Sequence, residues 1–522
     1  MILSEHLVIV PIVLPLVAGA VTLMIDETRL AAKAAISVVL TAALVAAAAA
    51  LVVLVDATGT HVYRLGDWPA PFGIVLVADR LSAAMALLAS ALGFACLVFA
   101  LARWQREGPR FHALVHFLLM GVNGAFLTGD LFNLFVFFEV LLAASYGLAL
   151  HASGALRVRA SLHYIVVNLV ASLLFLIGAS LMYAATGTLN LADLASRAAM
   201  IGSHERVLVE SAAAILGIAF LTKAGMWPLC FWLPSTYSAS SAPAAALFGI
   251  LTKVGVYVVL RLWLLLFAPG SGASAGFGAT WLVTGGMATI AFGTLGVIAS
   301  QNLPRLASYS ILVSSGILLA VVATGDPAVT GAALYYLIAS TLAGGALFLL
   351  IELVDRGRAP GADVLAVTAE AFAAGSGSVE ADDETGAAIP AAVALLGVSF
   401  VACALMLAGL PPLAGFVGKF ALLDALFRAP TVSGASWTML VLLLVSGFAV
   451  VIGMGRAGVR RFWASPDTAV PRVRVIEMVP VAFLLALCAA ITVEAAPVMR
   501  YLGEAAAMLH APRSYVESVL SR

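Results

Sequence analysis

Long apolar runs of about twenty residues alternate along this chain with short polar connections. Such a run forms a helix that spans the hydrocarbon core of a bilayer and satisfies its own backbone hydrogen bonds in lipid. A membrane barrel would need short alternating strands instead. The pattern predicts an all-α polytopic membrane protein with about 14 transmembrane helices. They cover residues 4–24, 31–55, 76–102, 111–128, 130–150, 159–184, 208–232, 242–267, 279–299, 304–323, 329–354, 390–428, 435–455 and 475–498.

Two of these helices cannot be simple spans. In the seventh, Pro228 and Pro234 each remove a backbone hydrogen bond shortly after Lys223. The twelfth covers 39 residues, which at about 1.5 Å per residue is roughly 58 Å and nearly twice the bilayer core. It must bend, and residues 409–412 (Gly-Leu-Pro-Pro) mark the place. Paired interrupted helices indicate an inverted repeat, which we assign to helices 4–8 and 9–13.

The repeat predicts four parts of the chain. Residues 1–110 hold three N-terminal helices and an ordered outer loop, and residues 111–267 hold the first five-helix repeat. Residues 279–455 hold the second repeat, and residues 456–522 the C-terminal helix and tail. A segment within the second repeat, residues 355–389, is rich in Gly, Ala, Ser and acidic residues, which predicts a mobile cytoplasmic linker.

Basic residues gather in every second connection, which sets the orientation in a cell membrane. Cytoplasmic connections carry an excess of Lys and Arg, so both termini are expected outside the cytoplasm, with Arg64, Arg197 and Arg206 as exceptions. The basic connections contain Arg29, Lys33, Arg103, Arg106, Arg110, Arg157, Arg159, Arg305, Arg356, Arg358, Arg456, Arg460, Arg461, Arg472 and Arg474.

Composition narrows the class further. Of the 522 residues 63% are hydrophobic and 10% charged, which excludes a soluble globular domain. A formal net charge of zero gives no electrostatic reason to expect nucleic acid as a partner. The four cysteines lie in apolar runs without pairing or metal-ligand spacing, and we interpret them as small buried hydrophobic residues. The first apolar run lacks a basic flank, so we expect a retained helix rather than a signal peptide.

The candidate chemistry lies in charged residues within the apolar runs. Three of the four lysines, Lys223, Lys253 and Lys419, are there, and Glu139 is the carboxylate in the middle of a span. A charge at that depth costs at least a few kcal/mol, and a desolvated lysine, unlike arginine, can lose its proton. A buried Glu139–Lys223 ion pair could merely orient helices, but one acid cannot neutralise three bases.

We therefore predict a proton relay. Glu139 would tune the proton affinity of Lys223, Lys253 would pass the proton along the midplane, and Lys419 would exchange it with one aqueous side.

Other polar residues are weaker candidates. His112 and His116 share one helix face, as a hydrated access route or as ordinary interface histidines. Without a carboxylate or cysteine partner they do not make a metal site. Polar residues of helices ten and eleven could line a wet path or serve helix packing: Ser308, Ser310, Ser314, Ser340 and Thr341. Gly418-Lys419 is not a phosphate loop, because Phe420 stands where Ser or Thr is needed. No metal or cofactor is predicted.

With these residues in place, the chain resembles the antiporter-like subunits shared by proton-pumping NADH-quinone oxidoreductase and Mrp-type multisubunit cation/proton antiporters. The resemblance rests on residues 222–234, 241–257 and 411–420. Residues 66–79 and 130–146 are similar to the D-type subunits of Mrp-type monovalent cation/proton antiporters. The resemblance implies a fourteen-helix fold, assembly with other antiporter subunits, and exchange of cytoplasmic sodium or another monovalent cation for external protons.

One departure from the resemblance matters. Relatives often carry histidine and lysine in helix eleven, where this chain has residues 335–345 (Tyr-Tyr-Leu-Ile-Ala-Ser-Thr-Leu-Ala-Gly-Gly). Water held by Ser340, Thr341 and the serines of helix ten would have to bridge Lys253 to Lys419, or the path would leave elsewhere.

The sequence thus predicts a transporter subunit rather than an enzyme. It would translocate protons in a secondary Na⁺ (or other monovalent cation)/H⁺ antiporter, with other subunits, protons, a monovalent cation and membrane lipid as partners and no nucleic acid. Two alternatives stay open at this point. One is a proton-pumping subunit of NADH-quinone oxidoreductase or membrane hydrogenase, and the other is a structural subunit that carries out no transport.

Overall fold

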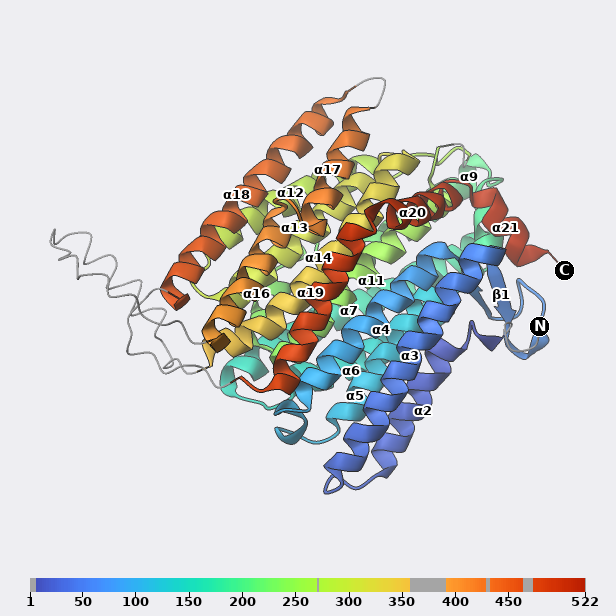
Figure 1. Ribbon diagram of the computed structural model, residues 1–522. Helices are drawn as coiled ribbons and strands as arrows, with labels where there is room; N and C mark the ends of the chain where they lie inside the picture. The colour runs from blue at the N-terminus through green and yellow to red at the C-terminus, as the bar shows by residue number, and fades with distance from the viewer. Residues whose placement is uncertain (1–5, 270–271, 357–390, 429–431, 463–472, 522) are drawn as a thin grey trace.

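The computed structural model describes residues 6–269, 272–356, 391–428, 432–462 and 473–521, and most of these residues are helical (Figure 1). The helices are α2 (Val10–Met24), α3 (Leu30–Thr58), α4 (Arg80–Ala100), α5 (Phe111–Leu127), α6 (Leu131–Leu150), α7 (Ala155–Thr186), α8 (Leu191–Ala198), α9 (Ser203–Ala224), α10 (Trp232–Ala239), α11 (Ala242–Leu266), α12 (Ala279–Ala299), α13 (Leu303–Val322), α14 (Pro327–Asp355), α16 (Ala391–Ala408), α17 (Ala414–Phe427), α18 (Gly434–Phe462), α19 (Val475–Val493), α20 (Ala495–Leu509) and α21 (Pro512–Leu520). Short 3₁₀ turns cover Leu65–Asp67 and Trp104–Arg106.

The helices that could span a membrane run side by side in one bundle (Figure 1). Among the described residues, 12 helices are long and apolar enough to cross a bilayer. The shorter apolar helices α2 and α5 stand where the first and fourth spans are predicted. The all-helical membrane fold is confirmed in outline, and the count of fourteen spans stays a prediction.

Both predicted helix interruptions are present. Helix α9 ends at Ala224, Gly225 takes a left-handed conformation at φ 73°, and α10 begins at Trp232. In the same way α16 ends at Ala408, Gly409 has φ 77°, and α17 begins at Ala414. Glycine adopts this backbone without a Cβ clash, so it ends each helix where the prolines that follow prevent its continuation.

The packing of helices agrees with two similar halves. Helix α5 pairs with α6 and α12 with α13, while α7 packs on α9 and α10 much as α14 packs on α16 and α17. This is the arrangement that the proposed repeat requires. The inverted repeat itself and the four domain boundaries stay predictions.

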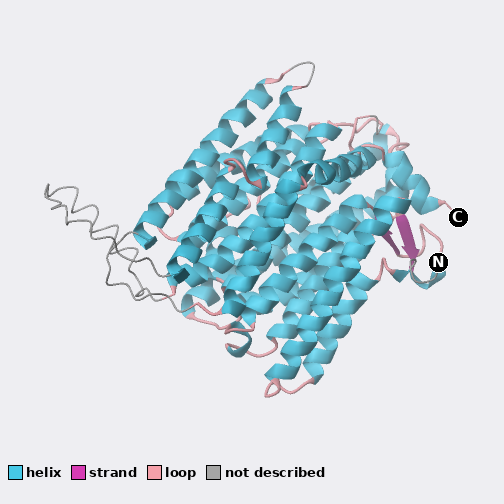
Figure 2. Ribbon diagram, in the orientation of Figure 1, coloured by secondary structure: helices cyan, strands magenta, loops and turns pink. Residues whose placement is uncertain are grey.

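A small sheet departs from the all-helical expectation. Strands β1 (His61–Arg64) and β2 (Val75–Ala78) pair antiparallel, with His61 opposite Ala78, at one edge of the bundle (Figure 2, magenta). The predicted third helix therefore begins at residue 80 rather than 76. Val75 and Val77 pack against Ala192 and Val519, so the hairpin has its own apolar contacts. We call the end of the bundle that carries this hairpin the hairpin end.

The C-terminal part also differs from expectation. The predicted last span, residues 475–498, ends as α19 at Val493, and the tail folds into α20 and α21. Figure 1 shows α20 running at an angle to the spanning helices, with α21 close to β1. Of the predicted linker, residues 357–389 lie outside the described part of the chain, and α14 continues to Asp355.

Helix α11 positions the site. It is buried along its whole apolar stretch and contacts α4, α9, α13 and α14, so polar side chains on α11 lie inside the protein rather than toward lipid.

Candidate functional site

Lys253 lies on α11 and bonds to a neutral oxygen. Its side chain is 2% exposed, and Nζ donates a hydrogen bond to Ser314 Oγ of α13 at 2.7 Å. Ser314 Oγ in turn donates to Ser340 Oγ of α14 at 2.9 Å. The lysine is thus held by a neutral hydroxyl, and in the described part of the chain no carboxylate bonds to it.

A cavity of about 20 Å³ joins Lys253 to Lys419. This is space for about one water molecule, which needs ~10–15 Å³ of such volume. Polar residues from three further helices line it: Ser310, Ser314, Tyr336, Ser340, Thr341 and Ser446. Four of the five residues predicted to bridge the two lysines therefore lie where a bridge is needed. Ser308 does not line the cavity.

Lys419 lies on α17, directly after the break in α16. Its Nζ donates to the carbonyl oxygens of Leu407 at 3.0 Å and Ala408 at 2.9 Å. These carbonyls have lost their helical partners because α16 ends there, so the ammonium caps a helix C-terminus. Lys419 thus supports the broken helix as well as facing the cavity.

No ion pair joins Lys223 to Glu139 among the described residues. Lys223 Nζ donates to Ser172 Oγ of α7 at 3.3 Å and lies 5.0 Å from the centre of the Phe138 ring. Glu139 Oε1 is buried without a hydrogen-bond partner in the described part of the chain. The alternative in which Glu139 and Lys223 form a buried ion pair that merely orients helices is therefore wrong.

A buried polar face of α7, which was not among the predicted features, leads to Lys223. Ser161, Tyr164, Asn168 and Ser172 follow one another at spacings of three, four and four residues, and all are buried. The Tyr164 hydroxyl bonds to Ser145 Oγ at 2.7 Å, and Asn168 Nδ2 donates to the Tyr164 carbonyl at 3.0 Å. The helical spacing of polar residues within an apolar run is the signal that could have found this face.

The two histidines lie apart from the lysines. His112 and His116 are buried in α5, which packs mainly on α2 and α6. His112 Nε2 bonds to Gln105 Oε1 at 3.1 Å, and neither histidine lines the cavity between Lys253 and Lys419. In the described residues no three metal-ligating side chains come together. The role of these histidines in proton access stays a prediction.

The comparison with known families decides the identity. Residues 128–452 match the model of the family described as NADH:quinone oxidoreductase/Mrp antiporter, TM. The chain belongs to this family. It is 55% identical over 528 aligned residues to the probable K(+)/H(+) antiporter D-type subunit of Rhizobium meliloti (strain 1021), covering 99% of this chain and 98% of the relative. It is 35% identical over 522 residues to the Na(+)/H(+) antiporter D-type subunit of Bacillus subtilis (strain 168), covering 99% of both.

Solved structures agree with these sequence matches in fold. A chain in the structure of the Mrp complex from Dietzia sp. DQ12-45-1b is 28% identical, with a TM-score of 0.80 and full coverage of both chains. A chain of an archaeal membrane-bound sulfane sulfur reductase has a TM-score of 0.84 over 99% of this chain at 22% identity, a likeness that shows the fold alone. The resemblance to the D-type subunits of Mrp-type antiporters is confirmed, and the chain is a multispan transporter subunit rather than an enzyme.

Proposed function

We propose that this chain is the proton-translocating membrane subunit of a secondary monovalent cation/proton antiporter. The observation that carries the proposal is the cavity between Lys253 and Lys419, lined by hydroxyl groups of α13, α14 and α18. This cavity supports a continuous proton path between the two lysines, although residues 335–345 of α14 between them contain no charged residue. The relay consists of Glu139, Lys223, Lys253 and Lys419. The polar face of α7 conducts protons to Lys223 from one end of the bundle.

The wider setting is part of the same proposal. The hairpin end faces the outside of the cell membrane, and the chain works with the other subunits of an antiporter complex. A proton gradient drives cation exchange without redox or nucleotide chemistry. One relative is named for K⁺ and another for Na⁺, so the cation is monovalent and its identity is a matter for ion-substitution assays.

The relay is tested by Lys223→Ala in the reconstituted complex. Loss of the titratable group should abolish cation-dependent proton flux across liposomes, while the complex still assembles. A matched control is Lys33→Ala, because Lys33 of α3 forms an ion pair at 2.9 Å with Glu27 in the turn before this helix, outside the relay. Normal exchange by an assembled Lys223→Ala complex would favour a purely structural subunit and end the relay proposal.

A further inference from the structure

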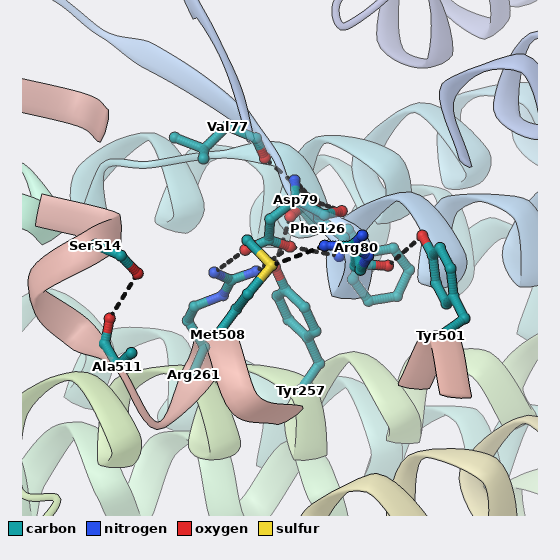
Figure 3. A network of polar contacts seen from close by, with 11 residues as sticks. Val77, Asp79, Arg80, Phe126, Tyr257, Arg261, Tyr501, Met508, Ala511 and Ser514 are labelled. Atoms are coloured by element: carbon teal, nitrogen blue, oxygen red, sulfur yellow. Dashed lines mark hydrogen bonds and ion pairs between the residues drawn. The ribbon is translucent and has the colours of Figure 1, made fainter. Parts of the chain in front are cut away.

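A buried ion pair closes the hairpin end of α11. Arg261 Nη2 donates to Asp79 Oδ1 at 3.0 Å, and Arg261 Nη1 donates to Oδ2 of the same carboxylate (Figure 3). Asp79 is the N-cap residue of α4 and also accepts from the Ser82 backbone at 2.9 Å. Both charged side chains are more than nine-tenths buried. The pair is therefore held in two-point geometry with little water around it.

Two tyrosines enclose the guanidinium. The Tyr257 hydroxyl accepts from Arg261 Nη2 at 2.9 Å and donates to the Phe126 carbonyl at 2.6 Å (Figure 3). The Tyr257 ring lies 5.3 Å from Arg261 Cζ, and the Tyr515 ring lies 5.6 Å from it. Tyr515 belongs to α21, so a C-terminal helix covers a charge that lies on the central helix.

The C-terminal helices are tied across this end by further bonds. The Tyr501 hydroxyl donates to the Arg80 carbonyl at 2.9 Å, and Arg80 pairs with Glu504 at 2.8 Å. A cavity of about 20 Å³ remains between these helices and the ion pair, lined by Thr60, Asp79, Arg261 and Tyr515 among others. Space for about one water molecule therefore lies directly beyond the pair.

The place of Arg261 connects this pair to the relay. Lys253, Tyr257 and Arg261 follow one another four residues apart, so they share one face of α11. Eight residues separate Lys253 from Arg261, which is about 12 Å along the helix. Lysine can release its proton when it is desolvated, whereas arginine keeps its charge, and a fixed positive charge in a narrow path excludes protons and cations.

We propose that the Asp79–Arg261 pair, covered by Tyr515, seals the relay from the aqueous phase at the hairpin end. The seal would keep protons on Lys253 from leaving along α11, so that they continue toward Lys419. This inference rests on the proposed relay. An ion pair that only joins α4 to α11 would hold the helices together without limiting proton flux.

The seal is tested by the passive proton flux of the intact complex in liposomes without a transported cation. Tyr515→Leu keeps an apolar side chain but removes the ring over the guanidinium, and it should raise this flux severalfold. Tyr515→Phe keeps the ring and is the matched control, which should stay as tight as the wild type. Tyr515→Leu complexes that assemble and remain tight would overturn the proposal.

A second variant covers the case in which Tyr515→Leu does not assemble. Arg261→Lys keeps a charge but loses the two-point bond to Asp79, and it should leak in the same assay. A tight, assembled Arg261→Lys complex would count against the seal.

Adding Lys253→Met to whichever variant leaks shows where the protons pass. Loss of the leak supports the seal, and a leak that persists overturns it, because that flux bypasses the relay. Failure of the proposed relay is detected by a different measurement, namely normal cation/proton exchange by the Lys223→Ala complex.

Discussion

At the scale of single residues, the buried cationic side chains fall into two groups, those bonded to neutral oxygens and those paired with carboxylates. Lys223 and Lys253 bond to serine hydroxyls and Lys419 to backbone carbonyls, whereas Lys33 and Arg261 pair with carboxylates. A carboxylate stabilises the charged form strongly, while a neutral oxygen does so less. In the part of the chain that the structure describes, the three lysines without carboxylate partners are those that a proton relay would need.

Removing one hydroxyl should test this distinction. Ser314→Ala takes away the group that accepts from Lys253 and donates to Ser340, so the cavity loses its central link. We expect cation-dependent proton flux to fall at least about tenfold, because a hydrogen bond to a charged group contributes roughly 1.5–3 kcal/mol and about 1.4 kcal/mol corresponds to a factor of ten. Initial rates in liposomes measure the effect.

The neighbouring serine provides the control for that substitution. Ser315 is buried, and its Oγ has no hydrogen-bond partner among the described residues. Ser315→Ala should leave the rate close to that of the wild type. Equal rates for both alanine variants would show that the Ser314 bridge is not used.

At the scale of elements, the two broken helices satisfy their freed backbone groups differently. After α9, the Trp232 indole donates to the Thr222 carbonyl at 3.2 Å, and Thr289 Oγ1 accepts from the Trp227 backbone at 2.9 Å. After α16, the charged Lys419 supplies the bonds. Non-helical backbone at membrane depth is stable only when such partners exist. The second break therefore depends on a residue that the relay also uses.

Gly409 is the position where this dependence can be measured. It has φ 77°, and a Cβ there would lie 2.5 Å from Lys419 Cδ. Gly409→Ala should cost about 1–2 kcal/mol for the left-handed backbone alone and displace Lys419. We expect a lower unfolding temperature in detergent together with a reduced exchange rate.

Gly217→Ala serves as the control for Gly409→Ala. Gly217 lies within α9, and a Cβ there meets nothing within 4 Å. Alanine is favoured over glycine in a helix by about 0.8–1 kcal/mol, so this variant should be at least as stable as the wild type. If Gly409→Ala behaved like it, the proposed clash with Lys419 would be excluded.

Much of this architecture could be predicted because local sequence encodes the spans and their breaks. A run of about twenty apolar residues predicts a span. Gly and Pro within such a run predict a break, as at residues 409–412. Serines inside apolar runs indicated the bridge, but only the structure shows that Ser308 lies outside the cavity. The strands of four residues are too short for a periodic signal. The Asp79–Arg261 pair joins residues 182 positions apart, which no local pattern reveals.

At the scale of the whole molecule, the C-terminal helices bind several parts of the chain together at the hairpin end. Helix α20 packs on α14 and α4, and α21 packs on α8. His510, between them, bonds through Nε2 to Thr330 Oγ1 at 2.9 Å. The tail thus connects the second half of the bundle to the N-terminal hairpin. A change at His510 should therefore alter how α20 and α21 dock on the bundle.

Acidification at the hairpin end should loosen this attachment. Burial lowers the pKa of His510 below its ordinary 6.5, and the nearby Asp326 opposes this only in part. A histidine with a lowered pKa favours the docked state above pH 6.5, and that contribution is lost as the pH falls through the lowered value.

A spin label on a cysteine introduced at the exposed Glu517 should become more mobile below pH 6.5. The native cysteines are buried, so they should not react with the label. In His510→Gln, which can still bond to Thr330 but does not titrate, mobility should not change with pH. The same pH response in both proteins would show that another group controls the docking of α20 and α21.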